Sequence, residues 1–250
     1  MNAPQNLLMD DDLRGQVKLL GTLLGQVLLE FAGEDIFEAV ETLRRGFAEL
    51  HQQEDQQRRN ELMALIDAMP AAKVELVVRA FSSYFMLVNV AEESFAHRNR
   101  RGMLSHGMPL WEGSFDRTVA ELKAQGMSVN TLQAMVKRLH YAPVFTAHPT
   151  EARRRAVMEG MRRIFLICDQ LYSPNLGVND QRELETELAA EIQVMWRTDE
   201  LRSAKLEVRD EVRNGLYYVR ESLFEAVPKA YHFFENALRK HYGVNAHGVE

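Results

Sequence analysis

Apolar and polar residues alternate over the first fifty positions with the period of an α-helix. Two apolar stripes with this spacing lie on either side of Gly33. They consist of Leu13, Val17, Leu20, Leu24, Val27 and Phe31, and of Phe37, Val40, Leu43, Phe47 and Leu50. The spacing predicts two helices, because residues three and four apart share one helical face. Asp10–Asp12 suit the start of the first helix, and Gly33 predicts a tight turn into an antiparallel second helix.

The next stretch predicts a short helix, a long helix and a loop. The short helix, at about residues 58–68, ends before Pro70, because the residue before a proline disfavours helical angles. The long helix covers about residues 71–98. It is apolar nearly all round between Phe81 and Val90, which is typical of a helix in the middle of a bundle. Residues 98–113 contain three glycines, a proline and four basic side chains, which predicts a long exposed loop.

The rest of the chain also favours helices, with one strand among them. Ser114 and Ser128 suit the first positions of two short helices, the first ending at Gly126 and the second near residue 139. Longer helices are predicted at about residues 151–171, 180–202 and 208–242, and Pro228 is expected to kink or split the last one. Only Tyr141–Ala147 favours a strand. The fold class is therefore mainly α. A lone strand cannot satisfy its backbone groups, so we expect this chain to be part of a larger structure.

Composition and charge narrow the possible partners. The chain has 250 residues, of which 46% are hydrophobic and 26% charged, as in an ordinary folded protein. Its net charge of -6 gives no general attraction to nucleic acid or anionic membranes. The single cysteine, Cys168, and the lack of a secretory pattern in residues 1–12 favour the cytoplasm. The most apolar run, Val74–Val90, is interrupted by Arg79 and other polar residues, so we do not interpret it as a membrane span.

One segment combines groups suited to acid–base chemistry on an anion. The strand-like run reaches His148, Pro149 breaks the strand, and a helix is predicted to follow, with Thr150 as its cap and Glu151 in its first turn. The positive end of the helix dipole favours the neutral form of His148. The helix N–H groups and the guanidinium groups of Arg153–Arg155 would bind phosphate or carboxylate. A histidine beside such an anion site is what proton transfer to a phosphorylated or carboxylated intermediate requires.

The same arginines also fit an ordinary surface salt-bridge ladder. Its pairs would be Glu151 with Arg154 and Arg155, Arg155 with Glu159, and Glu159 with Arg162 and Arg163. Pairs at this spacing stabilise a helix by about 0.2–0.5 kcal/mol each. A histidine after a strand is also often only packed and hydrogen-bonded. Residue types and spacing alone leave both interpretations open.

Two motifs are specific enough to indicate a family. The first is Thr146-Ala147-His148-Pro149-Thr150-Glu151, followed two residues later by Arg154-Arg155. The second is Trp196-Arg197-Thr198-Asp199-Glu200-Leu201-Arg202. Together they resemble the histidine signature and a second motif of phosphoenolpyruvate carboxylases. The downstream runs 210–211, 221–224 and 226–229 are similar to the helices that follow in that family, so the resemblance covers at least residues 139–242.

The resemblance implies a reaction and residue roles. Members of the family join phosphoenolpyruvate and bicarbonate to give oxaloacetate and phosphate with Mg²⁺ or Mn²⁺, an anaplerotic carbon fixation that supplies the tricarboxylic acid cycle. It implies that His148 takes the proton from carboxyphosphate and helps hold CO2 near the enolate. Arg154 and Arg155 would arrange anionic groups, whereas Arg153 lies outside the motif. We interpret the motif residues 199 and 200 as caps or ion-pair partners. The intact protein is expected to be a cytoplasmic homotetramer.

The resemblance also implies that most of the enzyme lies outside this chain. Family members are much longer and form a (β/α)8 barrel surrounded by many helices, whose first strand would lie near residues 143–147. We therefore predict an N-terminal helical region, 1–140, and a second region, 141–250, with the first barrel strand, the catalytic-histidine segment and the following helices. The metal ligands and main substrate arginines lie far downstream in the family. We expect no metal site in this chain and no activity of the chain alone.

Two other functions deserve comparison. A helical interaction module without enzymatic activity would account for the long amphipathic helices and the missing barrel. A nucleic-acid binder would account for the basic runs at 98–101, 153–155 and 162–163. The negative net charge and the absence of aromatic residues between these basic side chains argue against the nucleic-acid binder.

Overall fold

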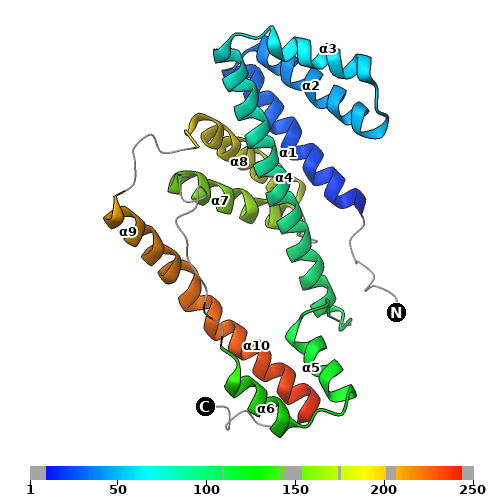
Figure 1. Ribbon diagram of the computed structural model, residues 1–250, viewed down its shortest axis with the longest axis vertical. Helices are drawn as coiled ribbons and strands as arrows, with labels where there is room; N and C mark the ends of the chain where they lie inside the picture. Colours follow the sequence, from blue (N-terminus) through cyan, green and yellow to red (C-terminus); the bar gives the residue numbers. More distant parts are fainter. Residues whose placement is uncertain are drawn as a thin grey trace. The chain divides into compact units, whose positions relative to one another are not determined.

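The described part of the chain folds into helices joined by turns and loops. The structure is a computed structural model that describes residues 10–108, 110–140, 142, 154–173, 176–200 and 207–243. All regular secondary structure within these ranges is helical (Figure 1), which confirms the mainly α fold class for this chain. The chain divides into two compact units. The larger comprises residues 8–98 and 153–201, and the smaller comprises residues 1–7, 99–152 and 202–250.

The larger unit contains six helices or parts of helices among its described residues. They are α1 (Asp10–Phe31), α2 (Glu34–Gln52), α3 (Gln56–Asp67), α4 (Ala71–Ser105) up to residue 98, α7 (Arg155–Leu171) and α8 (Val178–Arg197). Gly33 has φ 96°, a value that favours glycine, and it separates α1 from α2 as predicted. Asp55 caps α3 by accepting hydrogen bonds from the backbone N–H groups of Gln57 at 2.9 Å and Arg58 at 3.2 Å.

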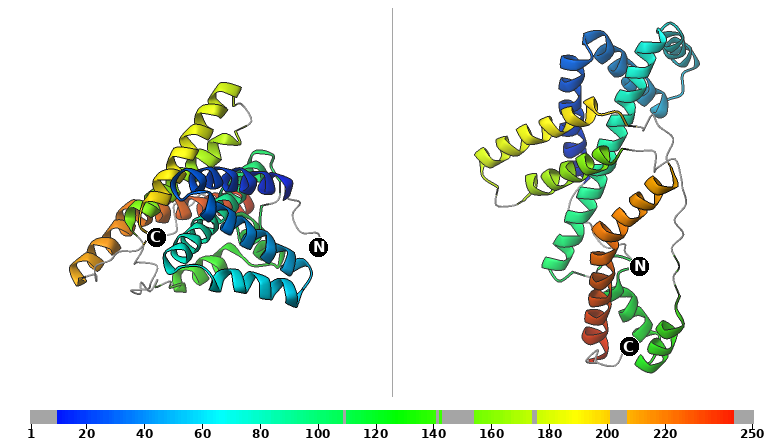
Figure 2. Two further views of the ribbon diagram at one scale, coloured as in Figure 1. Left: turned by 90° about the horizontal axis from the view of Figure 1, so that it is seen from above. Right: turned by 90° about the vertical axis from the view of Figure 1, so that its left-hand side faces the viewer.

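The core of the larger unit joins helices that are distant in the sequence. Helices α7 and α8 lie side by side as an antiparallel pair (Figures 1 and 2), and α8 also packs against α1. Ile164, Leu188, Ile192 and Leu87 are essentially inaccessible to solvent within one continuous apolar cluster. Their amphipathic spacing explains this burial, because each helix turns one apolar face inward. The result is a single core that includes residues from both halves of the chain.

The smaller unit is built around contacts between α5 and α10. Its described helices are α5 (Phe115–Ala124), α6 (Val129–Arg138), α9 (Val208–Tyr218), the short π-helix η2 (Val219–Leu223) and α10 (Phe224–Tyr242). Ser114 caps α5 by accepting from the Arg117 N–H at 3.3 Å. Ser128 caps α6 by accepting from the Thr131 N–H at 3.1 Å. Both serine caps were predicted from the sequence, since a serine side chain satisfies an N–H group that has no partner inside the helix.

The loop predicted at residues 98–113 is wrong over its first half and is confirmed for the described residues 106–108 and 110–113. Residues 98–105 continue α4 as a helix, although their glycine and basic residues favoured a loop. The reason is tertiary, because the Arg98 guanidinium is buried and donates to Ser94 Oγ at 2.6 Å and to Gln16 Oε1 at 2.8 Å. Met103 is also buried. A buried guanidinium needs hydrogen-bond partners, and the helical conformation lets Arg98 reach them. An exposed arginine would not favour a helix for this reason.

Two other predicted helices have different limits. Helix α8 ends at Arg197 rather than near residue 202, because Thr198 has extended backbone angles, φ -96° and ψ 125°. The last helix is split as expected, but by η2, which ends before Pro228, while Pro228 lies inside α10. Proline cannot bond the carbonyl four residues earlier, which belongs to Phe224. The π-type bonding just before Phe224 is a usual site of helix irregularity.

Helix α4 also meets a simple test for membrane spans. It contains the only window among the described helices that is long and apolar enough to cross a membrane, with a mean hydropathy of 1.4 over 18 residues. This is weak evidence, since the central helix of a bundle passes the same test. Val77, Leu87 and Ala91 of α4 belong to the apolar core. We therefore interpret α4 as a core helix.

The predicted strand at residues 143–147 lies outside the described residues. The predicted boundary near residue 140, between regions 1–140 and 141–250, stays a prediction.

Candidate functional site

The histidine of the first motif, His148, lies outside the described residues, together with Arg153. Arg154 and Arg155 are described and lie at the start of α7. The helix begins at Arg155 with Arg154 as its N-cap, so it starts later than the sequence predicted. The backbone N–H of Arg154 donates to the carbonyl oxygen of Glu200 at 3.0 Å. This bond joins the end of the first motif to the second motif.

Asp199 of the second motif lies between two arginines. Its Oδ2 is 3.3 Å from Nη2 of Arg154, and its Oδ1 is 4.0 Å from Nη2 of Arg79 on α4. The expectation that Asp199 is an ion-pair partner is confirmed. All three side chains are partly exposed, so each pair contributes at most about 1 kcal/mol to stability. The pairs matter more for orientation, because they limit the positions that the Arg154 guanidinium can take.

Arg79 connects α4 to the turn that carries Asp199. Its Nη2 donates to the carbonyl oxygen of Thr198 at 3.1 Å. Its guanidinium carbon lies 5.1 Å from the ring centre of Trp196, which is buried. A cation over an aromatic ring contributes about 0.5–2 kcal/mol. These contacts of Arg79, with the Thr198 carbonyl and the Trp196 ring, therefore stabilise the turn that carries Asp199.

Arg79 was not predicted as part of this site. One signal was available, since Arg79 is a charge inside the apolar run Val74–Val90. A charged residue in a core helix generally has a polar partner. The sequence could not show which partner, because Thr198 lies 119 residues away.

Arg155 forms an ion pair within its own helix, as the surface salt-bridge ladder predicted. Its Nε donates to Glu159 Oε1 at 2.8 Å, one helical turn further on. The ladder does not continue along α7, because Nε of Arg163 pairs with Glu191 Oε1 on α8 at 2.7 Å. That hydrogen bond raises the pKa of Arg163. Arg154 thus contacts residues outside α7, whereas the ion pair of Arg155 with Glu159 lies within α7.

No three histidine, cysteine, aspartate or glutamate side chains gather in a way that could hold a metal ion within the described ranges. The described residues therefore do not fit a metal centre. That the metal ligands lie in other parts of the protein stays a prediction.

The structure thus defines a helical protein in which Arg154 and Arg155 lie at the start of α7, a few residues after the histidine motif in the sequence. Such helix starts are typical of sites that bind phosphate or carboxylate. The chain belongs to the phosphoenolpyruvate carboxylase family, whose sequence pattern matches residues 13–249.

Several relatives support the same family. The chain is similar to a phosphoenolpyruvate carboxylase of Nitrosomonas eutropha, with 33% identity over 232 residues. It is 37% identical to that of Roseiflexus castenholzii over 234 residues and 34% identical to that of Rhodothermus marinus over 235 residues. These alignments cover 93%, 92% and 93% of this chain, but 25%, 24% and 25% of the relatives. The chain therefore spans about a quarter of the length of the relatives it matches.

Proposed function

We propose that this chain is the N-terminal part of a carboxy-lyase that carboxylates phosphoenolpyruvate with bicarbonate to give oxaloacetate and phosphate. The observation that carries the proposal is the family match over residues 13–249, together with the motif around His148 and Arg154-Arg155. The whole protein would act in the cytoplasm as a homotetramer and supply the tricarboxylic acid cycle. The chain offers only part of such an active site.

The proposed reaction has three steps. Bicarbonate oxygen attacks the phosphorus of phosphoenolpyruvate, which gives carboxyphosphate and the enolate of pyruvate. Carboxyphosphate then gives its proton to His148 and breaks into CO2 and phosphate. The enolate carbon bonds to CO2, which gives oxaloacetate, and the proton leaves with phosphate. A neutral histidine is suited to this step, because it can accept a proton near neutral pH.

Arg154 and Arg155 would arrange the anionic groups of the reactants. A guanidinium suits this role, because its N–H groups can bind two oxygens of a phosphate or carboxylate at once. The ion pair with Asp199 supports a fixed position for the Arg154 side chain, and the bond from its backbone N–H to the Glu200 carbonyl holds the backbone at this residue. A fixed cation stabilises developing negative charge without reorganisation during the reaction.

The family is in general metal-dependent, and Mg²⁺ or Mn²⁺ would stabilise the negative charge of the phosphate and the enolate. The described residues do not fit such an ion, so we assign its ligands to other parts of the protein and derive no step through it.

The test is a His148→Asn substitution in the protein at its natural length. Oxaloacetate is measured through its reduction by malate dehydrogenase, with phosphoenolpyruvate and bicarbonate as substrates. The substitution should lower the rate by roughly 10²–10⁴-fold, the usual contribution of an acid–base group. His140→Asn is the matched control, since His140 is exposed and lies eight residues earlier. The control should keep the full rate.

The alternative, a helical interaction module, predicts the opposite. If the whole protein forms no oxaloacetate, or if His148→Asn leaves the rate unchanged, the carboxylase proposal is wrong. The 250-residue chain alone should be inactive, and oxaloacetate formation by this chain would contradict that expectation.

A further inference from the structure

The larger unit has a groove that the proposed reaction does not use. It lies between α1, α2 and α4 and has a volume of about 800 Å³. Its apolar lining includes Val17 and Leu13 of α1, Phe37 and Val40 of α2, and Phe81 and Tyr84 of α4. A volume of about 300–1,000 Å³ with an apolar lining is typical of sites for small organic ligands. The groove therefore has the size and surface of a binding site.

Two glycines of α1, Gly21 and Gly25, line this groove. A glycine inside a helix lowers its stability by about 0.5–1 kcal/mol relative to alanine. A Cβ at Gly25 would lie 3.2 Å from Phe37 Cε2, so close packing explains that glycine. A Cβ at Gly21 would meet only Tyr84 Cε2, at an ordinary 3.6 Å. Packing therefore does not require glycine at position 21, and the missing side chain leaves the groove open.

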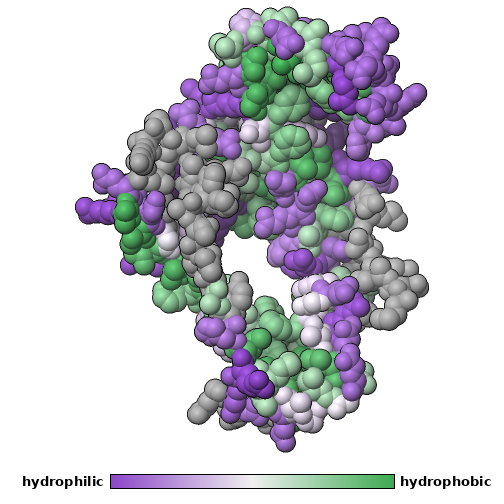
Figure 3. Space-filling view, in the orientation of Figure 1, coloured by the Kyte–Doolittle hydropathy of each residue, from purple (hydrophilic) through white to green (hydrophobic). Residues whose placement is uncertain are grey.

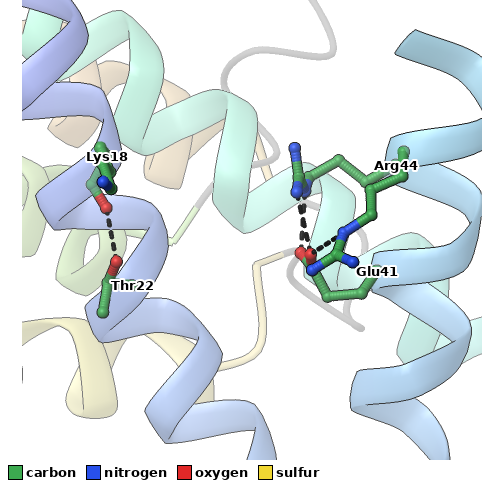
Figure 4. A network of polar contacts seen from close by, with 5 residues as sticks. Lys18, Thr22, Glu41 and Arg44 are labelled. Atoms are coloured by element: carbon green, nitrogen blue, oxygen red, sulfur yellow. Dashed lines mark hydrogen bonds and ion pairs between the residues drawn. The ribbon is translucent and has the colours of Figure 1, made fainter. Parts of the chain in front are cut away.

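The rim of the groove is basic, although the whole chain is acidic. Arg14 and Lys18 of α1, and Arg44 and Arg45 of α2, lie along it with a single carboxylate, Glu41. Figure 4 shows Lys18 and Thr22 on α1 and the Glu41–Arg44 pair on α2.

Glu41 is already paired. Arg44 donates to its two oxygens at 2.8 and 2.9 Å, and Arg45 Nε lies 3.2 Å from Oε2. The hydrogen bond from Arg44 holds the pKa of Glu41 below its usual range. Across the groove, the Lys18 ammonium has no carboxylate partner among the residues that the structure describes. The backbone carbonyl of Lys18 accepts a hydrogen bond from Thr22 Oγ1 at 2.8 Å. The rim thus carries an excess of positive charge beside an apolar surface.

We propose that this groove binds a small organic anion, with its apolar body on the aromatic lining and its carboxylate or phosphate group at Lys18 and Arg44. Charge complementarity supports this occupant, because the rim is basic in a chain of net charge -6. Desolvation at the groove wall strengthens an ion pair relative to one in bulk water. Arg154, Arg155 and Asp199 do not line this groove, and the proposal does not depend on the proposed carboxylase activity.

The test uses three probes with one apolar body, 1-naphthyl phosphate, 1-naphthoate and 1-naphthol. Binding to the protein at its natural length is measured by calorimetry, and the two anions separate a phosphate preference from a carboxylate preference. At least one anion should bind about tenfold more tightly than 1-naphthol, because hydrogen bonds to charged groups are stronger than those between neutral groups. Lys18→Ala should weaken anion binding by about fivefold or more and leave 1-naphthol unaffected.

A second pair of variants tests the shape of the groove. Gly21→Leu should weaken all three probes, because its side chain would occupy the open space. Gly21→Ala is the milder version that should remain folded, with weaker binding and a higher Tm. Gly15→Ala is the matched control on the same helix, since a Cβ there meets nothing within 4 Å. Lys229→Ala, on α10, is the control for loss of a lysine charge.

Three results would overturn the proposal. They are equal affinity for 1-naphthol and both anions, binding that survives Lys18→Ala and both Gly21 substitutions, and absence of binding by any probe. Absence of binding would mean that another part of the protein or a partner covers the groove.

Discussion

The two units of this chain differ in how they bury apolar side chains. The larger unit has one core that joins α1, α2, α3, α4, α7 and α8. In the smaller unit, the cluster of buried apolar residues in the described part consists of Val119, Leu132, Ala237 and Leu238. Burial of apolar area is the main favourable contribution to folding. The comparison therefore indicates that the larger unit supplies most of the chain's own stability.

The smaller unit also leaves an apolar helical face exposed. Val208, Val212 and Leu216 of α9 recur at helical spacing and are exposed, and apolar surface over α9 is visible in Figure 3. Apolar faces of this kind usually contact another surface. Since the chain spans about a quarter of its relatives, we expect other parts of the protein to provide that surface.

Matched leucine substitutions would test the comparison most strongly. Leu188→Ala in the larger core should cost about 3–5 kcal/mol, because tight surroundings leave a cavity. Leu132→Ala in the smaller core should cost about 2–3 kcal/mol, because its partly buried neighbours can move into the space. Urea unfolding monitored by circular dichroism measures both values. A larger cost at Leu132 would reverse the comparison.

Asp199 and Arg79 of the larger unit are expected to position the Arg154 guanidinium for the proposed reaction. Asp199→Asn and Arg79→Ala, in the protein at its natural length, should lower the kcat/KM for phosphoenolpyruvate by about 10–100-fold, because small displacements of a positioning group are costly. Arg163→Ala removes a similar ion pair on the same unit, the one with Glu191, and should leave kcat/KM unchanged. The Tm of each variant is measured as well. If Arg163→Ala lowers kcat/KM as much as Asp199→Asn and Arg79→Ala do, and the three variants lose the same Tm, then Asp199 and Arg79 act only on stability.

A third prediction concerns the close contact between α2 and α3. A Cβ at Gly46 would lie 2.7 Å from both terminal carbons of Leu62, which is buried. Gly46→Ala should therefore cost about 1–3 kcal/mol, as overpacked cores do. Gly15→Ala should instead stabilise the chain by about 0.5–1 kcal/mol, because nothing opposes its side chain. The free energy of unfolding in urea distinguishes the two, and a stabilised Gly46→Ala protein would contradict the close contact.

The smaller unit should depend more on its caps. Ser128→Ala removes the hydrogen bond to the Thr131 N–H and should cost about 1 kcal/mol. Ser105→Ala is a control for the loss of a serine hydroxyl, because its Oγ donates to a carbonyl within α4 and caps no helix start. Thermal unfolding of the two variants gives the difference, and equal Tm values would show that the cap contributes nothing.

The smallest expected effect is the loss of stability of the smaller unit when the pH is lowered. Asp116 Oδ1 lies 2.9 Å from His241 Nε2 and 3.0 Å from Lys240 Nζ. Burial acts to raise the pKa of Asp116, but the hydrogen bonds from Lys240 and His241 prevail and hold it below the usual value. Its stabilising effect is therefore present above the unfolded pKa of about 3.9 and is lost as the pH falls through the lower folded value.

The Asp116→Asn protein should thus have a lower Tm at neutral pH. Its Tm should also fall less than that of the unsubstituted protein as the pH drops below about 4. Asp67→Asn is the control, since Asp67 is exposed and has no ion pair within the described ranges. An unchanged acid dependence in the Asp116→Asn protein would show that this carboxylate is not linked to folding.

The sequence alone determined the parts of this protein that depend on near neighbours. Helical spacing predicted α1 and α2, and Gly33 predicted the turn between them. Ser114 and Ser128 predicted the starts of α5 and α6. These signals all act within one or two helical turns. The motifs around His148 and Trp196 indicated the family for the same reason, since each lies in one short stretch of chain.

Only the tertiary structure decided which distant residues meet. Arg98 continues α4 because Gln16, 82 residues away, accepts its hydrogen bond. Arg79 and Arg154 come together at Asp199 because the core brings α4, α7 and the end of α8 to one place. The groove between α1, α2 and α4 has the same origin. Spacing along the chain does not specify such contacts, because they depend on how the apolar faces of several helices pack at once.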